Sequence, residues 1–335
     1  EDEVRNIITS SPPKSCELDP IPTKLLLSCL DSLIEHITFI INHSLRSGEV
    51  PDCFKRAIIS PLIKKPTLDP DDLKNYRPVS NLSFISKILE KVVLVQLKEY
   101  LNSHGLVEVH QSAYRQWHST ETALLKITND ILSSCDNGQV SLLTLLDLSA
   151  AFDTIDHTLL CSTLSKKFGF GGSVLDWFSS YLSNRQQAVM INGKLSQSHM
   201  LAYGVPQGSV LGPILYTLYT MPLGNEIKLH STQYHMYADD TQLYKSCKPD
   251  EIENVCKSVE KCCSSFKVWM HDQKLKLNDE KTEIVLCGTH HKIRNIDLPP
   301  ISIGDNLIPV SEKAKNLGVI LDSSLTMENQ INQIV

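Results

Sequence analysis

Hydrophobic positions recur along the chain with two different periods, which predict two kinds of element. Between residues 23 and 45, and again between residues 84 and 101, apolar side chains recur at helical spacing, so each segment is predicted to be a helix with one buried face. The segment Val140 to Leu146 is instead a continuous apolar run, which is typical of a strand buried on both faces. We therefore expect amphipathic helices packed around a buried strand.

A second strand signal lies in the sequence YHMYADDTQLYKS, which places two adjacent carboxylates between β-branched and aromatic residues. Such neighbours favour strands on both sides, so this stretch predicts a hairpin with Asp239 and Asp240 at its tip. Neighbouring side chains of a strand point to opposite faces, so only one of the two aspartates can face a given site squarely. We expect Asp239 to be the principal residue and Asp240 the accessory one.

A third carboxylate, Asp147, ends the buried run. A carboxylate at the end of a buried strand is costly unless it is paired or binds a cation. Strand-end carboxylates from distant parts of the chain are what a two-metal site needs, so Asp147, Asp239 and Asp240 are the predicted metal ligands. Two Mg²⁺ ions suit such a site because Mg²⁺ needs few carboxylates besides water and substrate phosphates, and Mn²⁺ is the alternative ion.

Around these acids, five ordered blocks resemble a known family: LLDLSAAFDTIDH, GVPQGSVLGPILYTLY, YADDTQLY, LNDEKTEIVLCG and AKNLGVILD. They are similar to the palm motifs of a reverse transcriptase from a non-LTR (LINE-type) retrotransposon. A lone YADD would be weak, but five blocks in order are specific. The resemblance implies an RNA-directed DNA polymerase, a nucleotidyltransferase that extends a DNA primer with dNTPs on an RNA template. It also implies an α+β right-hand polymerase fold, with fingers and an antiparallel palm sheet backed by helices.

The resemblance also assigns residues to the nucleotide and the template. Arg77 and either Lys64 or Lys65 would bind the triphosphate from a two-stranded flap. Each lysine taken alone is instead typical of a solvent-exposed edge strand. Phe152 would be the aromatic gate that excludes a ribose 2′-OH, whereas its alanine neighbours favour a core position. Arg115 would contact template or nucleotide, and an ordinary salt bridge explains it nearly as well.

Later motifs supply the remaining candidates. In GVPQGS, Gln207 and Gly208 would line the site of the template base and the nascent pair. Lys281 would lie beside the leaving pyrophosphate and act as general acid, whereas a lysine before a strand is commonly a surface residue. Leu317 and Gly318, in AKNLGVILD, would hold the primer end.

Two further acids are excluded from the metal site. A helix is predicted from Asp153 to Phe168, and Asp153 and Asp156 fall in its first turn. Carboxylates there cap backbone N–H groups and oppose the helix dipole. Their acidity is therefore explained by helix capping.

Composition bounds the class of protein. The 335 residues with 41% hydrophobic content are enough for one elaborate domain or two ordinary ones. No apolar run approaches the roughly 20 residues that span a bilayer, and no signal-peptide pattern begins the chain, so we expect an intracellular protein without a membrane partner. The resemblance implies the nucleus, although the chain shows no targeting signal. The sequence indicates no oligomeric state.

The cysteines and the net charge constrain the predicted function less than the motifs do. The ten cysteines form no CxxC pair, so free thiols are expected. The net charge of −6 is unexpected for a protein that holds nucleic acid, because Lys and Arg normally neutralise phosphates. Either local basic patches suffice, or strongly binding parts lie outside this chain.

Predicted boundaries are residues 1–52 for an N-terminal helical extension, 53–321 for the fingers and palm, and 322–335 for the start of a largely absent thumb. Because the chain begins with Glu1 rather than Met, we expect it to be part of a longer one.

Two alternative functions remain beside the reverse transcriptase. A decayed or domesticated copy would only bind nucleic acid or a partner, and a metal-dependent nuclease or phosphatase would use the same acids but leave GVPQGS and Phe152 unexplained.

Overall fold

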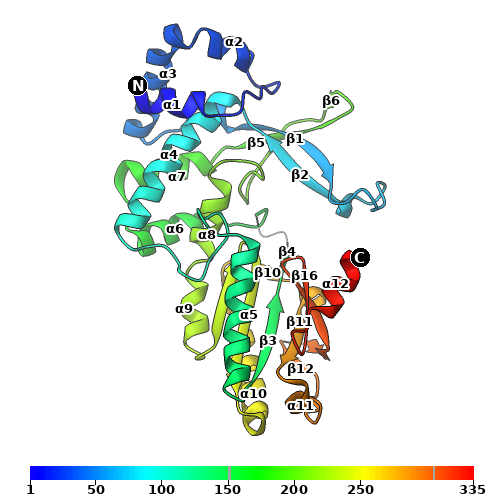
Figure 1. Ribbon diagram of the computed structural model, residues 1–335. Coiled ribbons are helices and arrows are strands. Elements are labelled where there is room, and N and C mark those ends of the chain that lie inside the picture. Colours follow the sequence, from blue (N-terminus) through cyan, green and yellow to red (C-terminus); the bar gives the residue numbers. More distant parts are fainter. Residues whose placement is uncertain (150–151, 305) are drawn as a thin grey trace. The chain divides into compact units, whose positions relative to one another are not determined.

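The computed structural model of the protein describes residues 1–149, 152–304 and 306–335, and it divides into two compact units (Figure 1). Unit 1 comprises Glu1–Val107 and Phe152–Tyr219, and unit 2 comprises Glu108–Ala151 and Thr220–Val335. The chain therefore enters each unit twice.

Unit 1 is mainly helical. Its helices are α1 (Asp2–Thr9), α2 (Thr23–Ser28), α3 (Leu30–Ser47), α4 (Phe84–Ser103), α6 (His157–Phe168) and α7 (Gly172–Leu182), and α8 (Gly212–Thr220) ends at the boundary with unit 2. The single helix predicted from residue 23 to 45 is two helices, because the backbone of Cys29 leaves the helical region with φ −106° and ψ 17°. Helix α4 matches its prediction and is capped by the Ser83 hydroxyl, which accepts the Ser86 N–H.

A small sheet in unit 1 carries the predicted flap. Strands β1 (Arg56–Ile63) and β2 (Tyr76–Asn81) pair antiparallel, with Leu62 opposite Arg77. The flap is wider than predicted, because β5 (Gln186–Ile191) pairs parallel with β1. The short strands β6 (Lys194–Leu195) and β7 (His199–Met200) pair with β5, and Asn192 and Gly193 form the turn between β5 and β6.

The central sheet of unit 2 is built on the buried run. Its strand order is β14 (Val310–Ser311), β11 (Glu283–Cys287), β3 (Val140–Leu146), β9 (Asp240–Cys247) and β8 (Gln233–Tyr237). All pairs are antiparallel except β11 with β14. Every residue of β3 is buried, as its apolar composition predicts for a strand covered on both faces.

Helices and hairpins cover this sheet. Helix α5 (Thr120–Asp136) places Ile127 and Ile131 against Leu143 and Leu145 of β3 in one apolar cluster. Helix α10 (Ile252–Asp272) packs on β9. The remaining elements of unit 2 are α9 (Leu223–Lys228), α11 (His290–Ile293), α12 (Glu328–Ile334), and the strand pairs β4 (Leu148–Ser149) with β10 (Lys276–Leu277), β12 (Ile301–Ile303) with β13 (Asn306–Ile308), and β15 (Lys313–Asn316) with β16 (Val319–Asp322). Short 3₁₀ turns lie at Asp52–Lys55, Leu73–Asn75, Pro249–Glu251 and Asp279–Lys281.

All ten cysteines are free thiols, as predicted. Within the described residues, none of the helices combines the length and the apolar character needed to cross a bilayer.

Candidate active site

The first candidate residue, Asp147, follows the last residue of β3 in unit 2. Its carboxylate Oδ2 accepts a hydrogen bond from Lys281 Nζ at 2.9 Å, and its carbonyl oxygen accepts the Asn278 N–H at 2.8 Å. Lys281 comes from the 3₁₀ turn that precedes β11, the strand next to β3. The cost of placing a carboxylate at a buried strand end is thus offset by a cation of the chain itself.

The YADD sequence forms the predicted hairpin tip. Tyr237 and Asp240 are the last pair between β8 and β9, which leaves Ala238 and Asp239 as a two-residue turn. Ala238 has φ +55°, as tight hairpin turns require at their first central position. Burial, followed by the charges of Asp239 and Asp147, raises the pKa of Asp240 to about 6. The three predicted carboxylates therefore repel one another.

One cavity of about 350 Å³ in unit 2 gathers several of the predicted residues. Its lining includes Asp147, Asp240, Lys281 and Leu317. Leu317 and Gly318 form the turn between β15 and β16, with φ 47° and 91°. Asp239 does not line this cavity. Its negative charge nevertheless raises the pKa of Asp240, which does line it.

The oxygen donors at this cavity decide whether a divalent metal fits the acids. Among the residues that the structure describes, no group of three His, Cys, Asp or Glu side chains converges closely enough to hold an ion. Asp147 and Asp240 nevertheless offer carboxylate oxygens to one cavity, and a hard cation takes its other ligands from water and substrate phosphates. A cation would also relieve the repulsion that raises the pKa of Asp240. The donor set therefore fits such an ion bound together with substrate.

In unit 1, hydrogen bonds fix both the side chain and the backbone of Gln207 in the GVPQGS loop. Gln207 Nε2 donates to both carboxylate oxygens of Asp153, at 3.0 and 2.9 Å, and the Gln207 carbonyl accepts the Ser80 N–H at 2.7 Å. Gly208 has φ +99°, and a Cβ there would lie 3.0 Å from the Ser80 carbonyl oxygen. Only glycine therefore lets the backbone of this loop pack directly against the backbone of β2. Gln207 and Gly208 thus lie together on a fixed backbone.

The prediction that Asp153 lies in the first turn of a helix is wrong. Helix α6 begins at His157, and Asp156 is its cap, accepting the Leu159 N–H at 2.9 Å. Asp153 instead binds Gln207, because the segment before α6 runs beside the GVPQGS loop. Gly204 makes this possible, since a Cβ there would lie 2.8 Å from the backbone of Asp153.

Phe152 and the flap residues lie in unit 1 as well. The Phe152 ring is half-buried and stacks on Tyr216, with centroids 4.8 Å apart and planes at 24°. This contact is compatible with either a core position or a gate. Lys64, Lys65 and Arg77 are exposed on the flap, and Lys64 Nζ donates to the carbonyl of Lys74 at 2.7 Å.

Sequence reasoning missed Gln111, a buried residue of unit 2. Its side chain is 2% exposed, and its Oε1 accepts the N–H groups of Ala113 at 2.9 Å and of Ala238 at 3.1 Å. Gln111 therefore fastens the YADD turn to the segment that follows Gln111. Its sequence neighbourhood gives no signal of this, because the partner Ala238 is distant along the chain.

Glu90 was also missed, although its position offered a signal. It lies on the apolar face of α4, spaced like the buried Ser86, Val93 and Leu97. Its Oε2 accepts the N–H groups of Val210 and Leu211, at 2.7 and 2.9 Å. Glu90 thus holds the backbone between the GVPQGS loop and α8.

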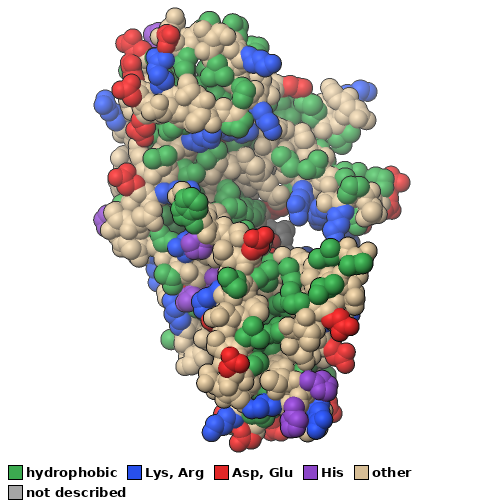
Figure 2. Space-filling view, viewed as in Figure 1, with side chains coloured by type: hydrophobic (Ala, Val, Ile, Leu, Met, Phe, Trp, Pro, Cys, Tyr) green, Lys and Arg blue, Asp and Glu red, His purple; other side chains and the backbone are tan. Residues whose placement is uncertain are grey.

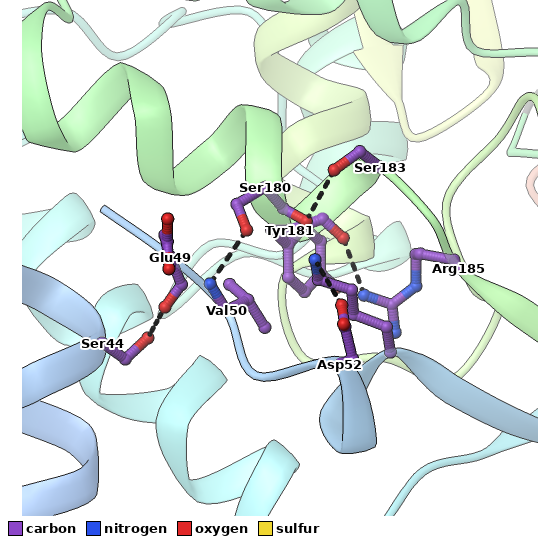
Figure 3. A network of polar contacts seen from close by, with 9 residues as sticks. Ser44, Glu49, Val50, Asp52, Ser180, Tyr181, Ser183 and Arg185 are labelled. Atoms are coloured by element: carbon purple, nitrogen blue, oxygen red, sulfur yellow. Dashed lines mark hydrogen bonds and ion pairs between the residues drawn. The ribbon is translucent and has the colours of Figure 1, made fainter. Parts of the chain in front are cut away.

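A buried arginine accompanies this acid. Arg185 is 1% exposed, donates from Nη1 to the Tyr181 carbonyl at 2.8 Å and lies over the Tyr181 ring (Figure 3). Burial raises the pKa of Glu90, and the positive charge of Arg185 acts in the opposite direction. The two residues are thus coupled by charge, whereas Arg185 Nε and Nη2 and Glu90 Oε1 have no hydrogen-bond partner among the described residues.

Comparisons with known proteins agree with these features. The family model "Reverse transcriptase (RNA-dependent DNA polymerase)" matches residues 63–321. The chain is 30% identical to a probable RNA-directed DNA polymerase from transposon X-element of Drosophila melanogaster and 28% identical to the RNA-directed DNA polymerase from mobile element jockey of the same species. These alignments cover 98% and 99% of this chain but 35% and 36% of the relatives. The chain thus spans about a third of the length of these curated relatives.

A solved structure supports the fold. Apo telomerase from Candida tropicalis, truncated from its C-terminal domain, matches with a TM-score of 0.54 and 16% identity, over 83% of this chain and 55% of that one. At this identity the likeness concerns the fold alone. The predicted α+β polymerase fold and the resemblance to non-LTR elements are confirmed. The family match over residues 63–321 shows that the chain belongs to the reverse transcriptase family.

Proposed function

We propose that the chain is the RNA-directed DNA polymerase domain of a non-LTR retrotransposon. It extends a DNA primer 3′-OH with dNTPs on an RNA template and releases pyrophosphate. The single observation that carries this proposal is the convergence of Asp147, Asp240 and Lys281 on one cavity, beside the charge of Asp239, in a chain of this family. The arrangement supplies anionic ligands and a proton donor within one unit.

Each group has a distinct role in the proposal. Asp147, Asp239 and Asp240 hold two Mg²⁺ ions, with Mn²⁺ as the alternative. When bound, these ions supply Lewis-acid stabilisation to the attacking and leaving oxygens. Lys281 is within hydrogen-bond distance of an Asp147 oxygen, so its ammonium can protonate a leaving phosphate oxygen beside that acid.

The remaining candidates act on the substrates. Gln207 and Gly208 line the place of the template base, and Phe152 excludes a 2′-OH. Lys64, Lys65 and Arg77 neutralise the triphosphate from the exposed flap. Leu317 and Gly318 support the primer end from the β15–β16 turn.

The proposal also assigns regions and a location. Residues 1–52 are a helical extension, 53–321 the fingers and palm, and 322–335 the start of the thumb. The protein acts inside the cell, in the nucleus, where a DNA primer is found.

Primer extension tests the proposal. The protein is incubated with a DNA primer on an RNA template, dNTPs and Mg²⁺, next to the Asp147→Asn variant. Extension by the wild type and its loss in the variant are expected. If the folded wild-type protein binds primer–template but adds no nucleotide, the chain is a binding module, as in a decayed copy. Cleavage of the template without extension would favour the nuclease.

A further inference from the structure

An exposed tryptophan of unit 2 stands on an unusual backbone. Trp117 is 88% exposed and has φ +65°, and Tyr114, three residues earlier, has φ +61°. Bulky residues rarely adopt this left-handed conformation, because their side chains crowd the backbone there. An indole in water also leaves a large apolar area uncovered. A loop that keeps two aromatic residues in this state must be held by its surroundings.

Contacts of the neighbouring residues hold this loop. Arg115 Nη1 donates to three backbone carbonyl oxygens, those of Glu108 at 3.1 Å, Val109 at 3.4 Å and Gln111 at 3.1 Å. After Trp117, the His118 N–H returns to the Arg115 carbonyl at 3.3 Å, and Ser119 begins α5 with a capping box. The backbone on both sides of Trp117 is therefore fixed, and the indole projects from a braced turn.

The braced loop is joined to the YADD turn. Gln111 Oε1 accepts from Ala113, at the start of the loop, and from Ala238, in the turn. The Ser112 N–H donates to the Met236 carbonyl at 3.0 Å, which extends β8 by a short parallel bridge. Burial, and then the charge of Asp239, raises the pKa of Tyr114. Trp117 is thus displayed from the same part of unit 2 that carries Asp239.

We propose that Trp117 is a stacking platform for a nucleobase of the single-stranded template. This inference rests on the proposed function and adds a binding site to it. A nucleobase suits an exposed indole because stacking uses the π face of any base and needs no charge. In a chain with a net charge of −6, stacking supplies affinity that phosphate contacts alone provide less readily. Arg115 then acts as a positioning residue for Trp117 through its three carbonyl partners.

Direct binding tests the platform without polymerisation. Fluorescence anisotropy of a labelled single-stranded RNA is measured, without dNTPs or metal, for the wild type and for Trp117→Ala and Trp117→Phe. Loss of the ring should weaken binding about tenfold, and Phe should restore most of it, because one stacked base contributes this order of affinity. Leu229→Ala is the matched control, since Leu229 is an apolar side chain of the same unit that is 77% exposed. The control should bind like the wild type.

A strand with abasic sites separates stacking from other causes. It keeps the phosphates but lacks the bases, so the wild type and Trp117→Ala should bind it equally. The dependence of binding on salt should also be the same in both proteins, because the substitution removes no charge. Equal binding of base-containing RNA by wild type and Trp117→Ala would overturn the proposal, as would an equal loss on both strands.

Failure of this inference is distinguishable from failure of the proposed function. If the protein does not extend primers but Trp117→Ala still weakens binding of base-containing RNA selectively, the platform stands and the polymerase proposal falls. If extension occurs and Trp117→Ala binds RNA like the wild type, the platform falls alone. A docking surface for a protein partner would give that second result. Circular dichroism of each variant confirms that the exposed substitution leaves the fold intact.

Discussion

Single residues differ in how far their role can be predicted from the sequence. Asp147 was predictable because a carboxylate that ends an apolar run needs a compensating partner, and the structure gives it Lys281. Asp153 and Gln111 were not, because their partners Gln207 and Ala238 are distant along the chain. A polar side chain shows its own chemistry in the sequence, whereas its partner becomes visible only in the fold.

The two YADD acids, Asp239 and Asp240, lie close enough for the charge of one to act on the other. Asp239→Asn should abolish primer extension, because it removes a charge from the proposed metal-binding group while keeping the shape of the side chain. The loss should be several kcal/mol of transition-state stabilisation. In metal-free buffer the melting temperature should stay level or rise slightly, since the Asp239 charge raises the pKa of Asp240 through repulsion. Extension at the wild-type rate would show that the metal assignment is wrong.

His235 allows a prediction about pH and stability. Burial, followed by the positive charges of His110, Lys126 and His118, lowers the pKa of this β8 residue to about 4. As pH falls below about 6.5, His235 binds a proton in the unfolded state but not in the folded state. The contribution of His235 to folding stability is therefore fully present above that pH and is lost as pH falls toward 4. The free energy of unfolding should fall by about 2 kcal/mol between about pH 7.5 and about pH 5 through this group.

Urea denaturation of the wild type and His235→Gln at both pH values measures this effect. Glutamine is neutral throughout and can still bond the Ser112 hydroxyl, which lies 2.8 Å from His235 Nε2. The variant should lose part of the pH dependence. An identical pH dependence in both proteins would assign it to other groups.

Phe152 separates a gate from a core residue in one experiment. If its ring packs against the sugar of the incoming nucleotide, Phe152→Val should raise kcat/KM for ribonucleotides relative to deoxyribonucleotides, because steric exclusion is relaxed. If the stack on Tyr216 is its main role, the same change should leave a cavity that costs a few kcal/mol of stability, without a change in sugar selectivity. An unchanged ratio together with a lower melting temperature would refute the gate.

Elements were predicted best where their pattern was local. The apolar run of β3, the YADD hairpin and α4 follow from period and turn residues alone. Element boundaries were less predictable: α6 begins at His157 rather than at Asp153, because Asp153 binds a distant loop. The break at Cys29 likewise follows no proline or glycine signal in the helical pattern.

Helix α4 is joined to the end of the GVPQGS loop through the buried Glu90, whose charge is coupled to that of the buried Arg185. Glu90→Gln keeps an acceptor for Val210 and Leu211 but removes the negative charge that acts on the buried Arg185, so the free energy of unfolding should fall by about 1–3 kcal/mol. The double variant Glu90→Gln with Arg185→Met should be more stable than the sum of the two single changes predicts, because neither charge remains. Urea denaturation of the four proteins gives the coupling energy. Additive effects would mean that the two residues do not interact.

At the scale of the whole molecule, motif order predicted the fold, while the division of the chain came from the structure. Each compact unit combines two separate segments, with changes of unit after residues 107, 151 and 219. Local composition offers no boundary at these places, because contacts between distant segments decide which residues form one body. The predicted boundaries at residues 52 and 321 instead follow the motifs.

Charge is a property of the whole molecule, and it sets the expected mode of nucleic-acid binding. The net charge is −6, and on the face shown in Figure 2 acidic and basic side chains are interspersed. We therefore expect weak binding of primer–template with a steep salt dependence, carried by a few phosphate contacts and screened as ionic strength rises.

Anisotropy titrations of labelled primer–template over a range of salt concentrations measure this dependence. The logarithm of the association constant should fall linearly with the logarithm of the salt concentration, and Arg77→Ala should reduce the slope by about one if Arg77 contacts a phosphate. Leu62→Ala, opposite Arg77 on the flap, is a matched control that removes no charge and should keep the wild-type slope. Tight binding that persists unchanged at high salt would contradict an electrostatic mode, and it would shift the source of affinity toward stacking at residues such as Trp117.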